Sequence, residues 1–190
     1  MIRSFVLAIP LLILATIASA VDAPPSMKAF VETEIMSWAA SPEVIEAVKA
    51  KNEKTAGFTE DDILKLDTQW RGEVGQADQP LIGEVMNNDL STFLSEHVAA
   101  SGGQITELFV MNAQGLNVGA SDVTSDYWQG DEDKHAKTYG VGPGEIFVDA
   151  IEFDESSQTY QGQVSVSLTD PDTGAVVGAM TIGLNAEAFF

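Results

Sequence analysis

The chain has 190 residues, of which 29 are acidic and 9 are basic, so its formal net charge is −20 at neutral pH. A protein this negative is repelled by nucleic acids and by anionic lipid surfaces, so both classes of partner are excluded. The sequence contains no cysteine, which excludes disulfides and thiolate catalysis. Its length and its hydrophobic fraction of 45% are typical of one folded globular unit.

The first 20 residues are predicted to be a signal peptide. Arg3 is their only charge, an apolar run follows over 5–17, and an Ala-Ser-Ala sequence at 18–20 supplies small residues at the spacing that a signal peptidase reads. The run is too short to span a bilayer comfortably, which disfavours an uncleaved anchor. We therefore expect a periplasmic or secreted protein that starts near Val21 and has no membrane span.

The region 21–103 is predicted to be helical. Its apolar residues recur at intervals of three and four, and proline or capping residues stand where most of these stripes begin. Two glycines at 102–103 mark the end of the last helix. The expected helices run over 27–38, from Pro42 to about Glu53, over 59–74, and from Pro80 to Val98.

The region 104–190 is predicted to form an antiparallel sheet. Apolar and polar residues alternate there, and a polar segment at 124–144 interrupts the strand-like runs. In the third run, Ile146 and Val148 are expected on one face of the sheet and Ile151 on the other. The expected strands cover 105–111, 116–121, 145–153, 160–169 and 175–184.

Helices followed by antiparallel strands predict an α+β fold, in which N-terminal helices pack on a five-stranded sheet. The signal peptide (1–20) is expected to be removed. The helical region (21–103) and the sheet region (104–190) are expected to form one folded unit.

Three segments of the second half resemble the Cache family of extracytoplasmic sensors. The family's first hairpin is similar to FVMNAQGLNVGAS (109–121), its pocket loop to SDYWQG (125–130), and its closing hairpin to VSVSLTDPDTGAVVGAMTIGLN (164–185). The resemblance implies a PAS-like sheet preceded by a long helix, with a small-molecule pocket beneath the pocket loop.

The pocket loop supplies the first candidate ligand-binding residues, Tyr127, Trp128 and Gln129. Large semi-polar rings can wall a cavity and offer a hydroxyl or an indole N–H to a ligand. Lys134 is one of few cations in the chain and could meet a carboxylate. The alternative is that the rings only plug the edge of the sheet, while the lysine neutralises neighbouring acids.

Gln163 and Ser165 complete the predicted ligand-binding set. Both project from the polar face of the strand 160–169. They line the pocket if that face turns toward it, and they are ordinary outward residues of a half-exposed antiparallel sheet if it does not.

One departure from the family limits the choice of ligand. Amino-acid-binding members typically place an arginine near the aromatic residues of the pocket loop, where it clamps the ligand's carboxylate. No arginine follows Arg71 in this chain, and a lysine is a poorer clamp. Amino-acid binding is therefore disfavoured, whereas another small carboxylate, an uncharged molecule or a cation stays open.

No catalytic residue, cofactor or metal site is predicted, so the protein is not expected to be an enzyme. The two histidines, His97 and His135, lie in different segments, and no serine lies in a Gly-flanked elbow. The acids at 131–133, with Asp122 and Asp126, match no complete calcium loop. A divalent-cation-binding domain and an interaction protein that docks a receptor through its helices are the alternative functions.

The expected function is ligand sensing. Sensors of the Cache family are usually held between two membrane spans and drive a kinase, cyclase or chemotaxis module. This chain ends at Phe190, a few residues after the last predicted strand. We therefore expect an exported, freestanding domain that binds a small molecule and signals through a separate membrane-bound partner, such as a sensor kinase or receptor.

Overall fold

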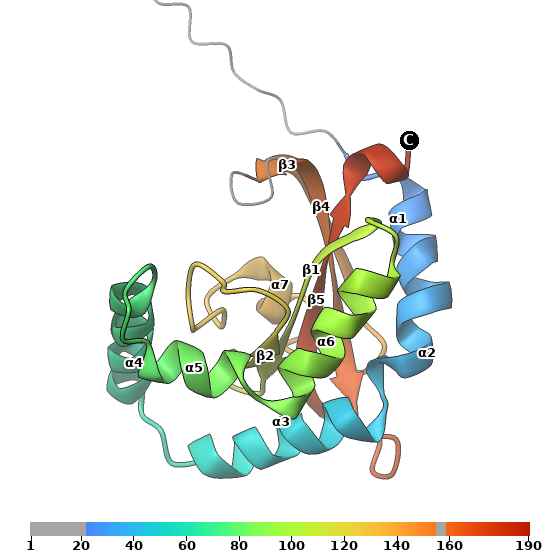
Figure 1. The fold of residues 1–190 in the computed structure, drawn as a ribbon. Coiled ribbons are helices and arrows are strands. Elements are labelled where there is room, and N and C mark those ends of the chain that lie inside the picture. The colour runs from blue at the N-terminus through green and yellow to red at the C-terminus, as the bar shows by residue number, and fades with distance from the viewer. Residues whose placement is uncertain (1–21, 155–158) are drawn as a thin grey trace, which may run out of the picture.

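The computed structural model describes residues 22–154 and 159–190, and the predicted signal peptide lies outside them. Helices come first and an antiparallel sheet follows (Figure 1). The helical segments are α1 (Pro25–Phe30), the π-helical turn η1 (Val31–Ile35), α2 (Met36–Ala39), α3 (Pro42–Thr55), α4 (Glu60–Glu73), α5 (Pro80–Met86), α6 (Asp89–Ala100), α7 (Asp133–Ala136) and the 3₁₀ turn η2 (Ala186–Ala188). The strands are β1 (Ile105–Asn112), β2 (Asn117–Ala120), β3 (Ile146–Asp154), β4 (Thr159–Thr169) and β5 (Val176–Asn185).

The five strands are arranged in the order β2-β1-β5-β4-β3, and every neighbouring pair is antiparallel. The last strand of the chain, β5, therefore takes the centre and joins the β1–β2 hairpin to the β3–β4 hairpin. The predicted α+β fold, with helices packed on a PAS-like five-stranded antiparallel sheet, is confirmed.

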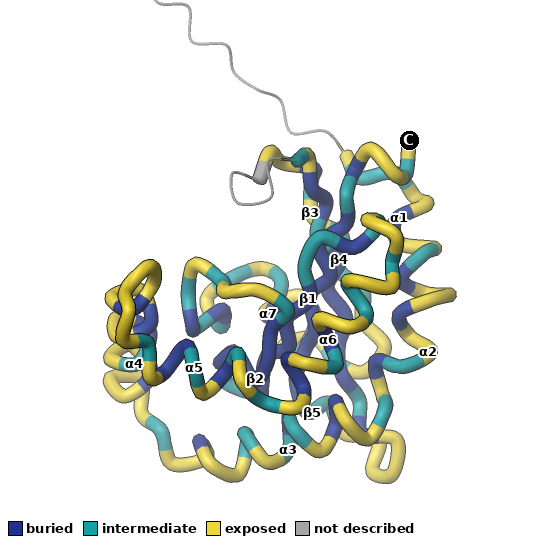
Figure 2. The backbone as a smooth tube through the Cα atoms, viewed as in Figure 1, coloured by how far each residue is buried: buried dark blue, intermediate teal, exposed yellow. Residues whose placement is uncertain are grey.

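The main core lies between one face of the sheet and the helices α1 to α3 and α6, and most residues of β1, β2, β4 and β5 are buried (Figure 2). On β4, the apolar residues Val164, Val166 and Leu168 face this core. Burying each such side chain contributes about 1.5–3 kcal/mol. Because side chains alternate along a strand, the polar residues between them must point to the opposite face.

The single helix expected over 80–98 is wrong, because the chain breaks it into α5 and α6. Asn88 caps the second helix, where its side-chain oxygen accepts the N–H of Ser91 at 2.8 Å. The break lets the two apolar stripes face different partners. Ile82 of α5 packs in a cluster with α4, whereas Leu94 of α6 packs in the main core.

The alternation expected for the third strand is also wrong at one position. The register of β3 against β4 shifts between Val148 and Ile151, and Ile151 is buried in the same core that Val148 contacts. A β-bulge adds a residue to one strand and so resets its alternation. The intervening residues Asp149 and Ala150 line a cavity on the far side of the sheet.

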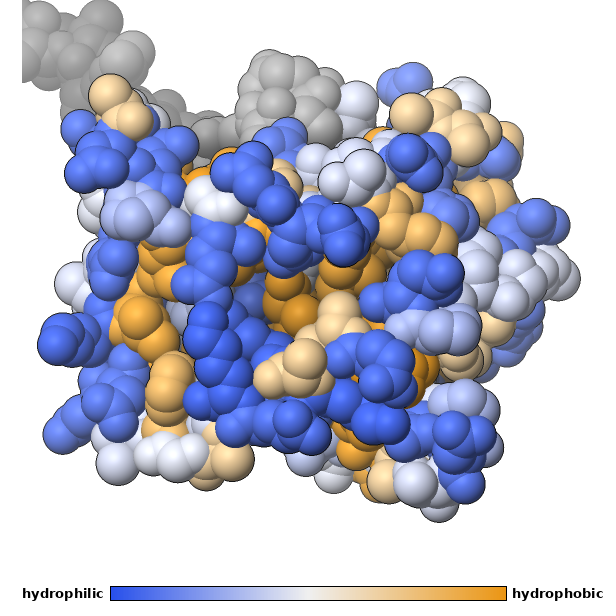
Figure 3. Space-filling view, turned by 60° about the horizontal axis from the view of Figure 1, so that its bottom comes forward, coloured by the Kyte–Doolittle hydropathy of each residue, from blue (hydrophilic) through white to orange (hydrophobic). Residues whose placement is uncertain are grey.

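The surface on the side of α3 is mostly hydrophilic, with apolar residues visible between the polar ones (Figure 3). None of the helices in the described ranges has both the length and the hydropathy needed to cross a bilayer.

Gly178 of β5 lies at a close approach to both β1 and α3. A Cβ atom there would overlap the carbonyl oxygen of Met111 on β1 and press against Val48 of α3. Gly178→Ala is therefore expected to lower the free energy of unfolding by about 1–3 kcal/mol, the usual cost of overpacking a core. Urea denaturation followed by circular dichroism measures this change.

Gly72→Ala is the matched control. Gly72 lies on an exposed part of α4, and no heavy atom lies within 4 Å of a Cβ built there. The substitution should raise the free energy of unfolding by about 0.5–1 kcal/mol, because alanine favours helix over glycine. Equal effects of the two substitutions would contradict the close packing of β5 under α3.

Candidate functional site

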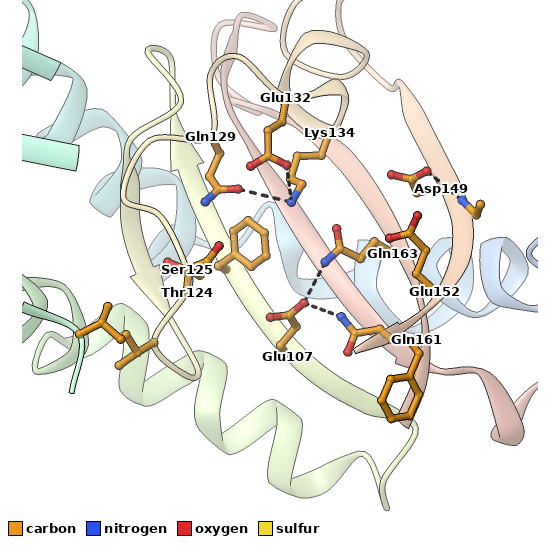
Figure 4. Close-up of a pocket in the computed structure, with 15 residues that line it drawn as sticks. Glu107, Thr124, Ser125, Gln129, Glu132, Lys134, Asp149, Glu152, Gln161 and Gln163 are labelled. Carbon is orange, nitrogen blue, oxygen red and sulfur yellow. Dashed lines mark hydrogen bonds and ion pairs between the residues drawn. The ribbon is translucent and has the colours of Figure 1, made fainter. Parts of the chain in front are cut away.

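A cavity of about 610 Å³ lies on the polar face of the sheet. The pocket segment (residues 121–145), which connects β2 to β3, borders it on one side, and the bulged strand β3 borders it on the other (Figure 4). Its volume lies within the range of about 300–1,000 Å³ that is typical of small-molecule sites. Its polar lining comes from β1 and β4 (Glu107, Gln161, Gln163), from the pocket segment (Thr124, Ser125, Gln129, Glu132, Lys134) and from β3 (Asp149, Glu152).

The floor of the cavity is a polar cluster that crosses the central strand. Glu107 Oε1 accepts hydrogen bonds from the side-chain amides of Gln161, at 2.5 Å, and Gln163, at 3.0 Å. Gly183 of β5 pairs with Glu107 on one side and with Gln163 on the other. A Cβ on Gly183 would lie 2.6 Å from Glu107 Cγ, so only glycine lets these side chains meet over β5.

Lys134 extends from α7 along the side of the cavity. Its ammonium lies 2.9 Å from a Glu132 carboxylate oxygen and 3.4 Å from Gln129 Oε1. It also lies 5.4 Å from the centre of the Phe109 ring, which belongs to β1. These contacts hold the lysine in place between the pocket segment and the sheet.

Of the other predicted site residues, Ser165 faces the same side of the sheet but does not line the cavity. It is buried, and its hydroxyl is 2.9 Å from the Thr181 hydroxyl on β5. The predicted residues that do line the cavity are Gln129, Lys134 and Gln163.

The rings of Tyr127 and Trp128 anchor the pocket segment on its outer side and do not line the cavity. Tyr127 is 1% exposed, and its ring stacks on Trp70 of α4 at 5.5 Å. Burial raises the pKa of the Tyr127 phenol well above its usual value. The indole N–H of Trp128 donates to the carbonyl oxygen of Gln114 at 2.8 Å. Both rings pack in or against the cluster that α4 and α5 form.

A buried carboxylate holds the same part of the pocket segment. Asp67 of α4 is 3% exposed, and its Oδ1 accepts the backbone N–H groups of both Tyr127 and Trp128 at 3.1 Å. Its other oxygen forms an ion pair with Arg71 at 2.5 Å, and Arg71 also reaches Asp126 at 3.5 Å. One wall of the cavity is therefore attached to α4.

The two histidines have packing roles. His135 is buried, its Nε2 is 3.2 Å from the carbonyl oxygen of Asn112, and its ring stacks on Tyr139. This contact makes Nε2 the protonated ring nitrogen, since a carbonyl can only accept. His97 packs against Trp38 and Phe93.

The acids considered as a calcium site are not gathered. Glu132 pairs with Lys134 and Asp133 pairs with Lys137. Across residues 22–154 and 159–190, no group of three or more His, Asp or Glu side chains is placed to hold a metal ion.

Sequence reasoning missed seven polar residues of the lining: Glu107, Thr124, Ser125, Glu132, Asp149, Glu152 and Gln161. Two of them carried a signal. Glu107 is a charged residue inside the apolar run 105–111, and Gln161 shares a face with Gln163. Glu152 carried none, because only the bulge turns it toward the cavity side of the sheet.

A second cavity, of about 570 Å³, lies between α3 and the α5–α6 pair. The cations that line it are Lys51 and Lys54, and both pair with Glu84. This cavity lies among the helices, away from the pocket segment.

No protein-family model matches the sequence, and no curated protein matches it significantly. Among solved structures, the sensor domain of the V. cholerae histidine kinase DctB is similar, with a TM-score of 0.50 and 8% identity over 87% of this chain and 52% of that one. The ligand-binding domain of the Campylobacter jejuni chemoreceptor Tlp3, in complex with 4-methylisoleucine, has a TM-score of 0.41 and 10% identity over 85% of this chain and 64% of that one. This chain therefore shares its fold with the DctB domain and spans about half the length of that domain.

Removing the Asp67 carboxylate should loosen the pocket segment. Asp67→Ala is expected to lower the free energy of unfolding by about 2–6 kcal/mol, because two backbone N–H groups lose their acceptor at about 1–3 kcal/mol each. The amide hydrogens of Tyr127 and Trp128 should exchange faster as well. Lys65→Ala, on the exposed side of the same helix, should change stability by less than about 0.5 kcal/mol. Unchanged exchange in Asp67→Ala would contradict the anchoring role.

His135 should make stability depend on pH. Burial lowers the pKa of His135 below its ordinary value of 6.5. The unfolded chain therefore takes up a proton near pH 6.5, while the folded protein takes it up only at lower pH. Stability is full above 6.5 and falls as the pH drops through the lowered pKa.

Urea midpoints measured between about pH 7 and pH 5.5 test this dependence, because histidine is the side chain that ordinarily titrates in that range. His135→Gln keeps an N–H donor for Asn112 and should flatten the dependence. His97→Gln should leave it intact. If only His97→Gln flattened the dependence, the pH dependence of stability would come from His97, and the prediction for His135 would be wrong.

Proposed function

We propose that this protein is an exported sensor domain that binds a small molecule in the cavity under the pocket segment and reports its occupancy to a separate membrane-bound partner. The observation that carries the proposal is the cavity itself. Polar side chains from β1, β3, β4 and the pocket segment converge on a space of about 610 Å³. A concave site with a few converging polar groups is the usual form of a small-molecule site.

The proposal takes the helical region (21–103) and the sheet region (104–190) as one folded unit. The shared core supports a single unit, since residues of α1, α3 and α6 pack with residues of β1, β4 and β5 in one cluster. The predicted signal peptide (1–20) supports a periplasmic or secreted location. The proposal assigns no catalytic activity and no cofactor.

Within the site, we assign direct ligand contact to Gln129, Lys134 and Gln163, which line the cavity. Tyr127 and Trp128 contribute indirectly, because they fix the pocket segment against α4. Ser165 supports the floor through its hydrogen bond to Thr181.

Helix α4 is the proposed route from the cavity to a partner. The pocket segment contributes Gln129 to the lining, and Asp67 ties the two residues before it to α4. Val74, which directly follows α4, also lines the cavity. A ligand that shifts the pocket segment would therefore move α4, whose outer side is exposed.

A thermal-shift screen of small carboxylates, amines, neutral polyols and divalent cations tests the proposal. At least one compound should raise the melting temperature in a concentration-dependent manner. Gln163→Ala should weaken that compound's binding by about tenfold, the effect of one lost polar contact in a closed site. Gln76→Ala, an exposed glutamine outside the lining, should leave the affinity unchanged.

Two results would count against the proposal. One is the absence of a shift with any compound. The other is a receptor that binds the protein equally with and without every compound and is unaffected by Gln163→Ala, which would instead support the interaction-protein alternative.

A further inference from the structure

The charges around the cavity are unequal. Among the described residues that line it, the carboxylates are Glu107, Glu132, Asp149 and Glu152, and the one cation is Lys134. The four acids come from β1, the pocket segment and β3, and they surround the cavity on several sides (Figure 4). The excess of negative charge is thus local to the cavity and is not only a property of the whole chain.

Lys134 neutralises only one of the four carboxylates. Its ammonium lies 2.9 Å from Glu132, so the two charges cancel each other. Its remaining contacts are to the neutral Gln129 side chain and the Phe109 ring. An anionic ligand would have to compete with Glu132 for the only ammonium in the described lining.

Two carboxylates flank Gln161, Glu107 on the floor and Glu152 at the rim. Glu107 accepts the Gln161 amide at 2.5 Å, and Glu152 is the direct cross-strand neighbour of Gln161 on β3. Directly paired residues on neighbouring strands share a face, with Cβ atoms about 4.5–5.5 Å apart. Glutamine amides orient a carboxylate but carry no net charge. The carboxylates of Glu107 and Glu152 therefore lie close together on the same face of the sheet.

The lining also includes the ring of Phe109, which is 2% exposed. Phe109 lies on the floor, and the Lys134 ammonium lies over its ring, 5.4 Å from the ring centre. Aromatic faces attract ammonium groups through their negative quadrupole. No arginine is present among the described lining residues to clamp an anionic group in a bidentate manner.

We propose that the cavity selects a small organic cation, an amine whose ammonium group is received by Glu107 and Glu152. This inference rests on the proposed function of the cavity as a ligand site. An organic cation fits better than a metal ion, because the acids are spread around the cavity and, within the described residues, no three of them are gathered as metal ligands.

Calorimetric titration with three matched series of linear compounds tests the inference. The probes are α,ω-diamines, α,ω-diols and α,ω-dicarboxylates of about three to eight carbons, which fit a cavity of ordinary ligand size. At neutral pH they differ in charge but little in length. We expect at least one diamine to bind with a dissociation constant about tenfold or more below those of the diol and dicarboxylate of the same length.

Charge-neutral variants locate the effect. Glu107→Gln and Glu152→Gln should each raise the dissociation constant of the diamine by about tenfold, the effect of losing one charged partner. Glu152 is exposed at the rim, so its variant stays informative if Glu107→Gln fails to fold. Glu96→Gln removes the same charge from the exposed side of α6 and should leave the affinity unchanged.

Other outcomes overturn the inference in distinguishable ways. Tighter binding of a diol or dicarboxylate, lost in Gln163→Ala, would refute cation selectivity but leave the cavity as a ligand site. Equal weakening by Glu96→Gln and Glu107→Gln would show that diamines bind only the general negative charge. No binding by any series would also refute the inference, and the broader screen described above would then decide whether the cavity binds ligands at all.

Discussion

The two faces of the sheet differ in polarity, and the rest of the structure depends on this difference. Side chains must alternate along a strand, so each residue of β4 points either to the helices or away from them. Val164 and Val166 point to the helices and form part of the core, while Gln163 and Ser165, which alternate with them, point to the other face. One strand thus builds both the hydrophobic core and the polar side on which the cavity lies.

The cavity needs a wall on that polar face, and a contact between distant parts of the chain provides it. The pocket segment has little regular structure beyond the four residues of α7. Asp67 compensates by accepting two of its backbone N–H groups, and Tyr127 is buried against Trp70 of the same helix. A buried carboxylate is costly unless it is hydrogen-bonded and paired, and here it is both. Stability and site geometry therefore rest on the same residue.

Glycine at the centre of the sheet has a comparable double role. Gly183 leaves room for Glu107, Gln161 and Gln163 to meet over β5. Gly178 lets β5 lie close to β1 and α3. Small residues in the middle strand thus allow polar groups to gather on one face and helices to pack closely on the other.

The sequence by itself determined the order of helices and strands, the α+β class and the polar face of β4, because these follow from local periodicity and turn residues. It grouped Gln129, Lys134 and Gln163 together, and all three line the same cavity. Only the tertiary structure decided which side of the pocket segment Tyr127 and Trp128 face, since their partner Asp67 lies 60 residues away from Tyr127 in the chain. It also decided the break at Asn88 and the bulge that turns Glu152 toward the cavity, because both depend on what packs against the chain there.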